Sequence, residues 1–100
     1  MKYYLVRLLA PRATFMQDMT AAERTMMQEH SAYWRSWMAK GNVVVFGPVA
    51  DPAWPLGIGV LRLDDGVDPA VMWKGDPVMR PGTGFRIEVL PMLTAVVAGS

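Results

Sequence analysis

The stretch NVVVFGPV, residues 42–49, is the densest run of β-branched residues in the chain, and it decides how the rest of the sequence is interpreted. Such a run is typical of a β-strand. A strand in a sheet with one face in water alternates apolar and polar side chains. Because apolar residues follow one another here without alternation, both faces of this strand are expected to be covered.

Three further segments are predicted to be strands. Lys2–Leu9 is mostly apolar, aromatic or β-branched and ends before Pro11. Leu56–Leu63 follows a proline-rich break, and its two glycines either weaken the strand or let another group approach the backbone closely. Residues 84–92 place Phe85, Ile87 and Val89 on one face and two charged side chains on the other.

Two helices are predicted between these strands. Residues 10–19 are interpreted as a loop, after which Thr20 and Glu23 form a capping box that begins a helix reaching Lys40. Gly41 stands where a helix commonly ends. Asp68 is predicted as the N-cap of a short second helix that reaches about Lys74, with a proline in its first position.

The element order β-α-β-β-α-β predicts a single α+β domain over residues 1–100. This is the order of the ferredoxin-like fold, an antiparallel sheet with both helices on one face. Two helices on one face leave the other face open, although the strand composition calls for cover on both. We therefore expect a homodimer whose sheets pack face to face. The tail, residues 93–100, is predicted to be an extra edge strand or a dimer contact.

Composition excludes several classes of protein. Ten basic residues give a formal net charge of +1 and are scattered, which argues against binding to nucleic acid or to an acidic membrane surface. The absence of cysteine excludes disulfides and thiolate chemistry. No cluster of carboxylates or histidines predicts a metal, and no motif predicts a cofactor. Arg7 and Arg12 interrupt the apolar start, so neither a signal peptide nor a membrane span is expected, and the sequence predicts a cytoplasmic protein.

His30 is the only histidine. Helical periodicity places it at the centre of the apolar stripe of the first helix, with Trp37 and Met26 on one side and Trp34 on the other. Burying an imidazole without a partner costs about 1–3 kcal/mol, so a partner is expected. His30 is then either a core histidine with one hydrogen bond or a proton-transfer group oriented by a carboxylate. Asp51 and Asp76, each followed by proline, are the candidate partners.

Three short motifs in order resemble the YciI-like (YCII-related) family. They are a histidine midway along the first helix, Gly47-Pro48 at the end of the second strand and Asp76-Pro77 after the second helix. The resemblance covers residues 4–92. It implies a dimeric α+β barrel of ferredoxin-like domains and an active site built on a histidine–aspartate pair, here His30 and Asp76. The chain departs from the family pattern at Val78, where an aromatic residue is common.

The function predicted on this basis is general acid–base catalysis on a small organic molecule, by hydrolysis, elimination or isomerisation. His30 is the expected proton-transfer group and Asp76 its orienting partner. Candidate substrate-binding residues are Gly47, Pro48, Tyr4, Trp34 and Arg80; Arg80 is either a ligand for an anionic substrate or a solvated loop residue. Two alternatives stay open: a non-catalytic binding or regulatory module, and a cofactor-free oxygenase or isomerase that relies on Trp34 and Tyr4.

Overall fold

The sheet has four strands, and each neighbouring pair is antiparallel. The computed structural model describes residues 1–99, and the strand order within them is β2-β3-β1-β4. The strands are β1 (Lys2–Leu9), β2 (Val43–Val49), β3 (Leu56–Leu63) and β4 (Arg86–Pro91). All four predicted strands are confirmed, with ends that differ by at most two residues from the predicted ones.

The long helix α2 (Ala21–Ala39) begins at the predicted capping box. The Thr20 hydroxyl accepts from the Glu23 amide at 3.1 Å, and the Glu23 carboxylate accepts from the Thr20 amide at 2.9 Å. These two bonds satisfy amides that the first turn of a helix leaves unpaired. Gly41, with a φ of 85°, follows the end of the helix as predicted.

The structure corrects two predictions about the shorter helices. Residues 10–19 are not all loop, because Phe15–Asp18 form helix α1. Asp68 is not the N-cap of α3 (Ala70–Trp73); Pro69 occupies that position, since the helix begins one residue later than predicted. The Asp68 carboxylate still accepts from the Ala70 amide at 2.9 Å. A 3₁₀ helix, η1 (Pro77–Met79), follows α3.

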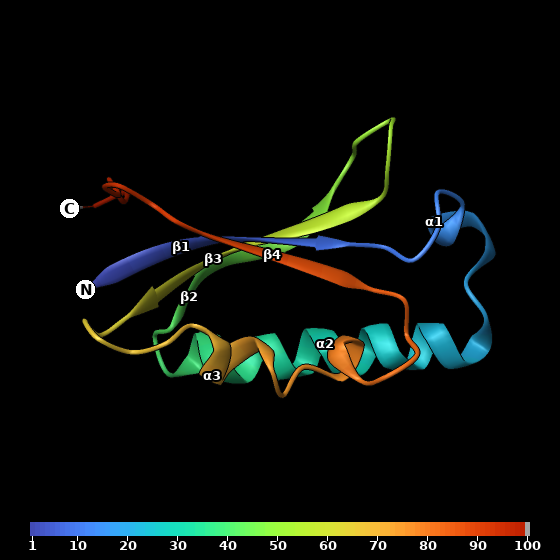
Figure 1. Cartoon of the computed structure of the whole chain (residues 1–100), viewed down its shortest axis with the longest axis horizontal. Helices are drawn as coiled ribbons and strands as arrows, with labels where there is room; N and C mark the ends of the chain where they lie inside the picture. The colour runs from blue at the N-terminus through green and yellow to red at the C-terminus, as the bar shows by residue number, and fades with distance from the viewer. Residues whose placement is uncertain (100) are drawn as a thin grey trace.

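The helices α2 and α3 lie on the same face of the sheet, and α1 lies beyond one end of it (Figure 1). The core is formed where α2 and α3 meet that face. Trp34 of α2 and Met72 of α3 are buried against Val6, Leu61 and Leu63 of the two central strands. The molecule is therefore a two-layer α+β structure.

The opposite face of the sheet, here called the outer face, is apolar along one complete row. The strand registers align Val45 with Val60, Val60 with Leu5, and Leu5 with Leu90. Val45 and Leu90, at the two ends of this row, are each 50% exposed. None of α1, α2 and α3 covers this face (Figure 1). The absence of alternation in the sequence thus corresponds to one apolar row on the outer face, beside which Arg7 and Glu88 form an ion pair on the same face.

The C-terminal tail continues from β4 without forming a further strand in residues 93–99. The Met92 amide, directly after β4, donates to the Tyr3 carbonyl at 2.9 Å. The predicted extra edge strand is therefore wrong for these residues, and Ser100 lies outside the described residues. Leu93 and Val96 are almost fully exposed.

Candidate functional site

His30 and Asp76 form a close pair although 46 positions separate them in the chain. The Nδ1 atom of His30 lies 2.7 Å from Oδ2 and 2.9 Å from Oδ1 of Asp76. The Asp76 side chain is 1% exposed, and that of His30 is 13% exposed. The imidazole therefore stands between a fully buried carboxylate and a space that a small molecule can reach.

The backbone around Asp76 explains how a carboxylate comes to be held here. A residue before proline avoids the α-helical region, and Asp76 is extended, with φ −67° and ψ 132°. It is the N-cap of η1, and its Oδ1 accepts from the Val78 amide at 3.1 Å. The preceding turn is fixed by Tyr33, whose hydroxyl donates to the Met72 carbonyl at 2.5 Å. Tyr33 also packs so tightly on Gly75 that a β-carbon there would lie 2.6 Å from the hydroxyl oxygen.

Trp34 is the third donor to Asp76. Its indole Nε1 donates to Oδ2 at 2.6 Å, and the residue is 3% exposed. The ring packs closely on β3 because Gly59 has no side chain: a β-carbon there would be 2.6 Å from Cη2 of the indole. This confirms the prediction that a glycine of β3 allows a close approach. Gly59 therefore places Trp34, and Trp34 helps to place the carboxylate.

The Asp76 carboxylate determines which nitrogen of His30 carries a proton. A carboxylate only accepts hydrogen bonds, so Nδ1 must be the protonated nitrogen. Nε2 has no hydrogen-bond partner among residues 1–99. It is not a buried orphan, because no buried side-chain nitrogen or oxygen in the described chain lacks a partner. In the neutral ring, Nε2 therefore presents a lone pair to the space beside it.

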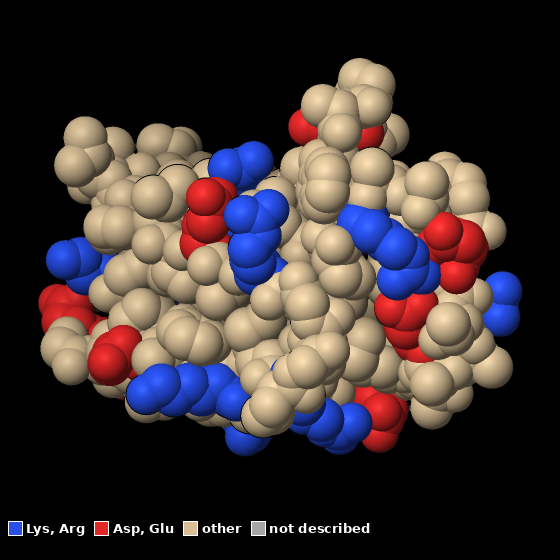
Figure 2. Space-filling view, turned by 45° about the vertical axis from the view of Figure 1, so that its right-hand side comes forward, with Lys and Arg blue, Asp and Glu red and all other residues tan. Residues whose placement is uncertain are grey.

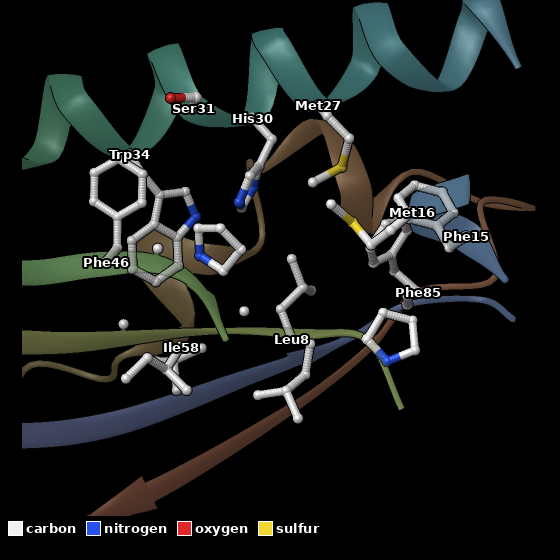
Figure 3. Close-up of a pocket in the computed structure, with 18 of the residues that line it drawn as sticks. Leu8, Phe15, Met16, Met27, His30, Ser31, Trp34, Phe46, Ile58 and Phe85 are labelled. Atoms are coloured by element: carbon white, nitrogen blue, oxygen red, sulfur yellow. The ribbon is translucent and has the colours of Figure 1, made fainter. Parts of the chain in front are cut away.

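That space is a cavity of about 250 Å³ between α2 and the sheet. Figure 3 shows the His30 ring projecting from α2 into the cavity, with Trp34 and Phe46 to one side and Met27 to the other. Spacings of three and four residues along α2 bring Met27, His30 and Trp34 to the same side of the helix. Leu8 lies opposite, on the sheet. The arrangement is that of an apolar pocket with an imidazole in one wall.

The segment that carries α1 closes one end of the cavity. Phe15 is buried and meets the Phe85 ring edge-on at 5.2 Å, and Met16 and Met19 line the space beside it. Arg12 ties this segment to α2 through Glu23 at 2.8 Å, and it also pairs with Asp18 at 2.7 Å. The hydrogen bonds from Arg12 and from the Thr20 amide lower the pKa of Glu23 to about 2.

The structure brings together most of the predicted site residues. Gly47, Pro48 and Trp34 line the cavity with His30. Tyr4 instead packs against the core cluster and is not among the residues that line the cavity. Arg80 lies outside it as well: its side chain is 59% exposed and 3.5 Å from the carboxylate of Glu29.

Asp51, the other candidate partner of His30, is not involved in the pair. It is exposed, and its carboxylate accepts from the Ala53 amide at 2.8 Å in its own turn. All three Asp-Pro sequences, which begin at Asp51, Asp68 and Asp76, thus use the aspartate to cap a local turn. Only the one at Asp76 is buried under α2, and tertiary packing rather than the motif makes that difference.

Several lining residues were not identified from the sequence. They are Leu8, Phe15, Met16, Met19, Met27, Phe46, Pro55, Gly57 and Phe85, among others. The sequence did carry a signal for some of them: TFMQDM, residues 14–19, is more apolar than a solvated loop usually is. The position of Gly57, on the same face of β3 as Gly59, was a second available signal.

Charge on the surface shown in Figure 2 is mixed. Acidic and basic side chains lie beside one another there, and large areas between them carry neither. Within residues 1–99, no group of three or more histidine, cysteine or carboxylate side chains is arranged to hold a metal ion. No helix in the part of the chain that the structure describes is long and apolar enough to cross a membrane.

No protein-family model matches the chain, and no curated protein matches it either.

Proposed function

We propose that this protein is an enzyme that uses His30 as a general acid–base group, oriented by Asp76, on a small organic molecule bound in the cavity. One observation carries the proposal. The buried Asp76 carboxylate, 2.7 Å from Nδ1, fixes the ring and leaves Nε2 directed to an apolar cavity. A core histidine needs one partner to satisfy its burial, but it does not need an accessible second nitrogen.

The geometry supports a simple proton cycle. The neutral ring accepts a proton at Nε2 from the substrate, or from a water that attacks it. The resulting imidazolium is stabilised by the carboxylate, which three donors hold in place. Nε2 then returns the proton to the leaving or rearranged group. Hydrolysis, elimination and isomerisation all use this cycle.

His30→Ala is expected to lower kcat at least a hundredfold, because a positioned acid–base group contributes about 10²–10⁴-fold to a rate. The substrate is first identified with a panel of esters, lactones and enolisable carbonyl compounds, with and without a hydroxyl group, followed by steady-state kinetics on the variant. Gln28→Ala, an exposed change on α2, is the control. A His30→Ala enzyme with the wild-type rate contradicts the mechanism. If His30→Gln keeps the protein's function at the wild-type level, the protein is a non-catalytic binding module instead.

For the fold, we propose a ferredoxin-like domain of the YciI-like kind. Two observations support this. The strand order β2-β3-β1-β4, read from the other edge, is the 4-1-3-2 arrangement that a β-α-β-β-α-β chain makes with antiparallel neighbours. In addition, the residues that carry the family resemblance, His30, Gly47-Pro48 and Asp76-Pro77, lie around one cavity or against its histidine.

We further propose that two copies of the chain associate through the outer face of the sheet. The row Val45, Val60, Leu5 and Leu90 runs across all four strands without a polar side chain. An apolar row of this kind, half exposed at both ends, is typical of an interface between subunits.

Light scattering after gel filtration at micromolar concentration is expected to give a mass twice the 11.1 kDa of one chain. Val45→Asp should shift the protein to the mass of a single chain, because it places a charge within the apolar row. Val71→Asp, at a site on α3 that is 55% exposed, is the matched control and should leave the mass unchanged. A wild-type protein that elutes only as a single chain rules out the dimer.

A further inference from the structure

We infer that the cavity binds a neutral, mainly apolar molecule of one or two fused rings, anchored by a single hydroxyl group that donates to Nε2 of His30. This inference rests on the proposed function, since it names the class of substrate for the same site. Three properties of the cavity carry it: its volume, the charges around it and the proton position on His30.

The volume limits the size of the ligand. A dry apolar cavity of about 150 Å³ accepts benzene. At about 250 Å³, this cavity is larger by roughly one further ring or a few substituents. Trp34, Phe46 and Phe15 supply aromatic walls, while Met16 and Met27 supply flexible ones that adapt to a planar ligand.

The charges around the cavity favour an uncharged ligand. Among the described residues, no lysine, arginine, aspartate or glutamate lines it. His30, when protonated, faces the Asp76 carboxylate at 2.7 Å, so the pair as a whole is neutral and offers an anion no net positive charge. When His30 is neutral, the pair carries one negative charge. A carboxylate or phosphate ligand would therefore lose its hydration without compensation.

The proton position on His30 requires a hydrogen-bond donor as the anchoring group. With the proton on Nδ1, Nε2 of the neutral ring is a hydrogen-bond acceptor. A carbonyl or ether oxygen has no hydrogen to donate to it, whereas a hydroxyl does. The hydroxyl is also the group from which Nε2, acting as a base, would remove a proton.

Gly57 supplies part of the space that the ligand needs. It lies on the face of β3 that meets the helices, between Leu8 on β1 and Pro48 on β2. A β-carbon there would have only the Gly47 carbonyl oxygen nearby, at 3.5 Å, which is an ordinary contact. A larger side chain at this position would therefore fill the cavity without a clash at its β-carbon.

The test uses three probes of similar shape: 2-naphthol, 2-naphthoate and 2-methylnaphthalene. Isothermal titration calorimetry at pH 7 measures the Kd of each for the wild-type protein, for Gly57→Val and for Val71→Leu, the control on the exposed surface of α3. We expect 2-naphthol to bind the wild-type protein at least tenfold more tightly than 2-naphthoate, and more tightly than 2-methylnaphthalene. Gly57→Val should weaken 2-naphthol binding at least tenfold with no loss of thermal stability, and Val71→Leu should leave it unchanged.

Three results would overturn the inference: 2-naphthoate binding as tightly as 2-naphthol, 2-naphthol binding unaffected by Gly57→Val, or no binding of 2-naphthol at all. Failure here is distinguishable from failure of the proposed function. If the enzyme acts on a charged substrate and His30→Ala abolishes that reaction, the inferred ligand class is wrong but the acid–base role of His30 stands. If the three probes bind as expected but His30→Ala keeps the wild-type catalytic rate, the acid–base role is wrong but the ligand class stands.

Discussion

Asp76→Ala is expected to lower the free energy of unfolding by about 3 kcal/mol or more, because three donors lose one acceptor. The imidazole Nδ1, the Trp34 indole and the Val78 amide all point at this carboxylate, whose side chain is 1% exposed. Each buried donor left unpaired costs about 1–3 kcal/mol. Urea unfolding, followed by tryptophan fluorescence, measures the change.

The chain contains a matched control for this prediction. Asp51 also precedes a proline and accepts one backbone amide, at 2.8 Å, but it is exposed. Asp51→Ala should change the free energy of unfolding by no more than about 1 kcal/mol. Asp76→Asn should lie between the two alanine variants, since an amide keeps one acceptor oxygen. If Asp76→Ala is no less stable than Asp51→Ala, Asp76 does not organise the site.

Gly59→Ala is expected to destabilise the protein by about 1–3 kcal/mol, because the added methyl group overlaps the indole of Trp34. Gly59 lies in β3 between Val6 of β1 and Phe46 of β2, so the backbone has little room to move away. The ring must therefore shift, and its 2.6 Å hydrogen bond to Asp76 is lost or lengthened. The expected consequences are a lower midpoint of urea unfolding and a lower catalytic rate.

Gly57→Ala gives the same chemical change two residues away on the same face of the strand. Its β-carbon makes only an ordinary contact, so the variant should be as stable as the wild type or up to about 1 kcal/mol more stable. Trp34→Phe replaces the indole by a smaller ring. Combined with Gly59→Ala, it should recover part of the stability that Gly59→Ala loses. If Gly57→Ala and Gly59→Ala are equally stable, the position of the Trp34 indole does not depend on Gly59.

Local sequence signals predicted most of the fold. The four strands, the capping box and the end of the long helix depend on neighbouring residues, and all are confirmed. The start of α3 was predicted one residue too early: the Asp68 carboxylate does accept from a backbone amide, but that amide belongs to Ala70, the first helical residue. Helix α1 was not predicted, since four residues carry too little periodicity. Phe15 belongs there because its ring packs on Phe85, a contact between distant parts of the chain.

The site was predicted in part, for a related reason. Periodicity put His30 on the buried side of its helix, and burial required a partner. The choice between Asp51 and Asp76 depends on which turn packs under α2, and no pattern in the chain encodes that directly. Trp34 was expected as a cavity wall; its hydrogen bond to Asp76 adds a positioning role that spacing alone did not reveal.

The central claim is that Asp76 holds the proton of His30 on Nδ1 and leaves Nε2 free to act. Long-range ¹H–¹⁵N correlation NMR of the single histidine, at a pH where the ring is neutral, tests this directly. We expect one tautomer in the wild type, with the proton on Nδ1, and a mixture of tautomers in Asp76→Asn, whose amide both donates and accepts. A wild-type ring protonated on Nε2, or an Asp76→Asn spectrum identical to that of the wild type, would contradict the account.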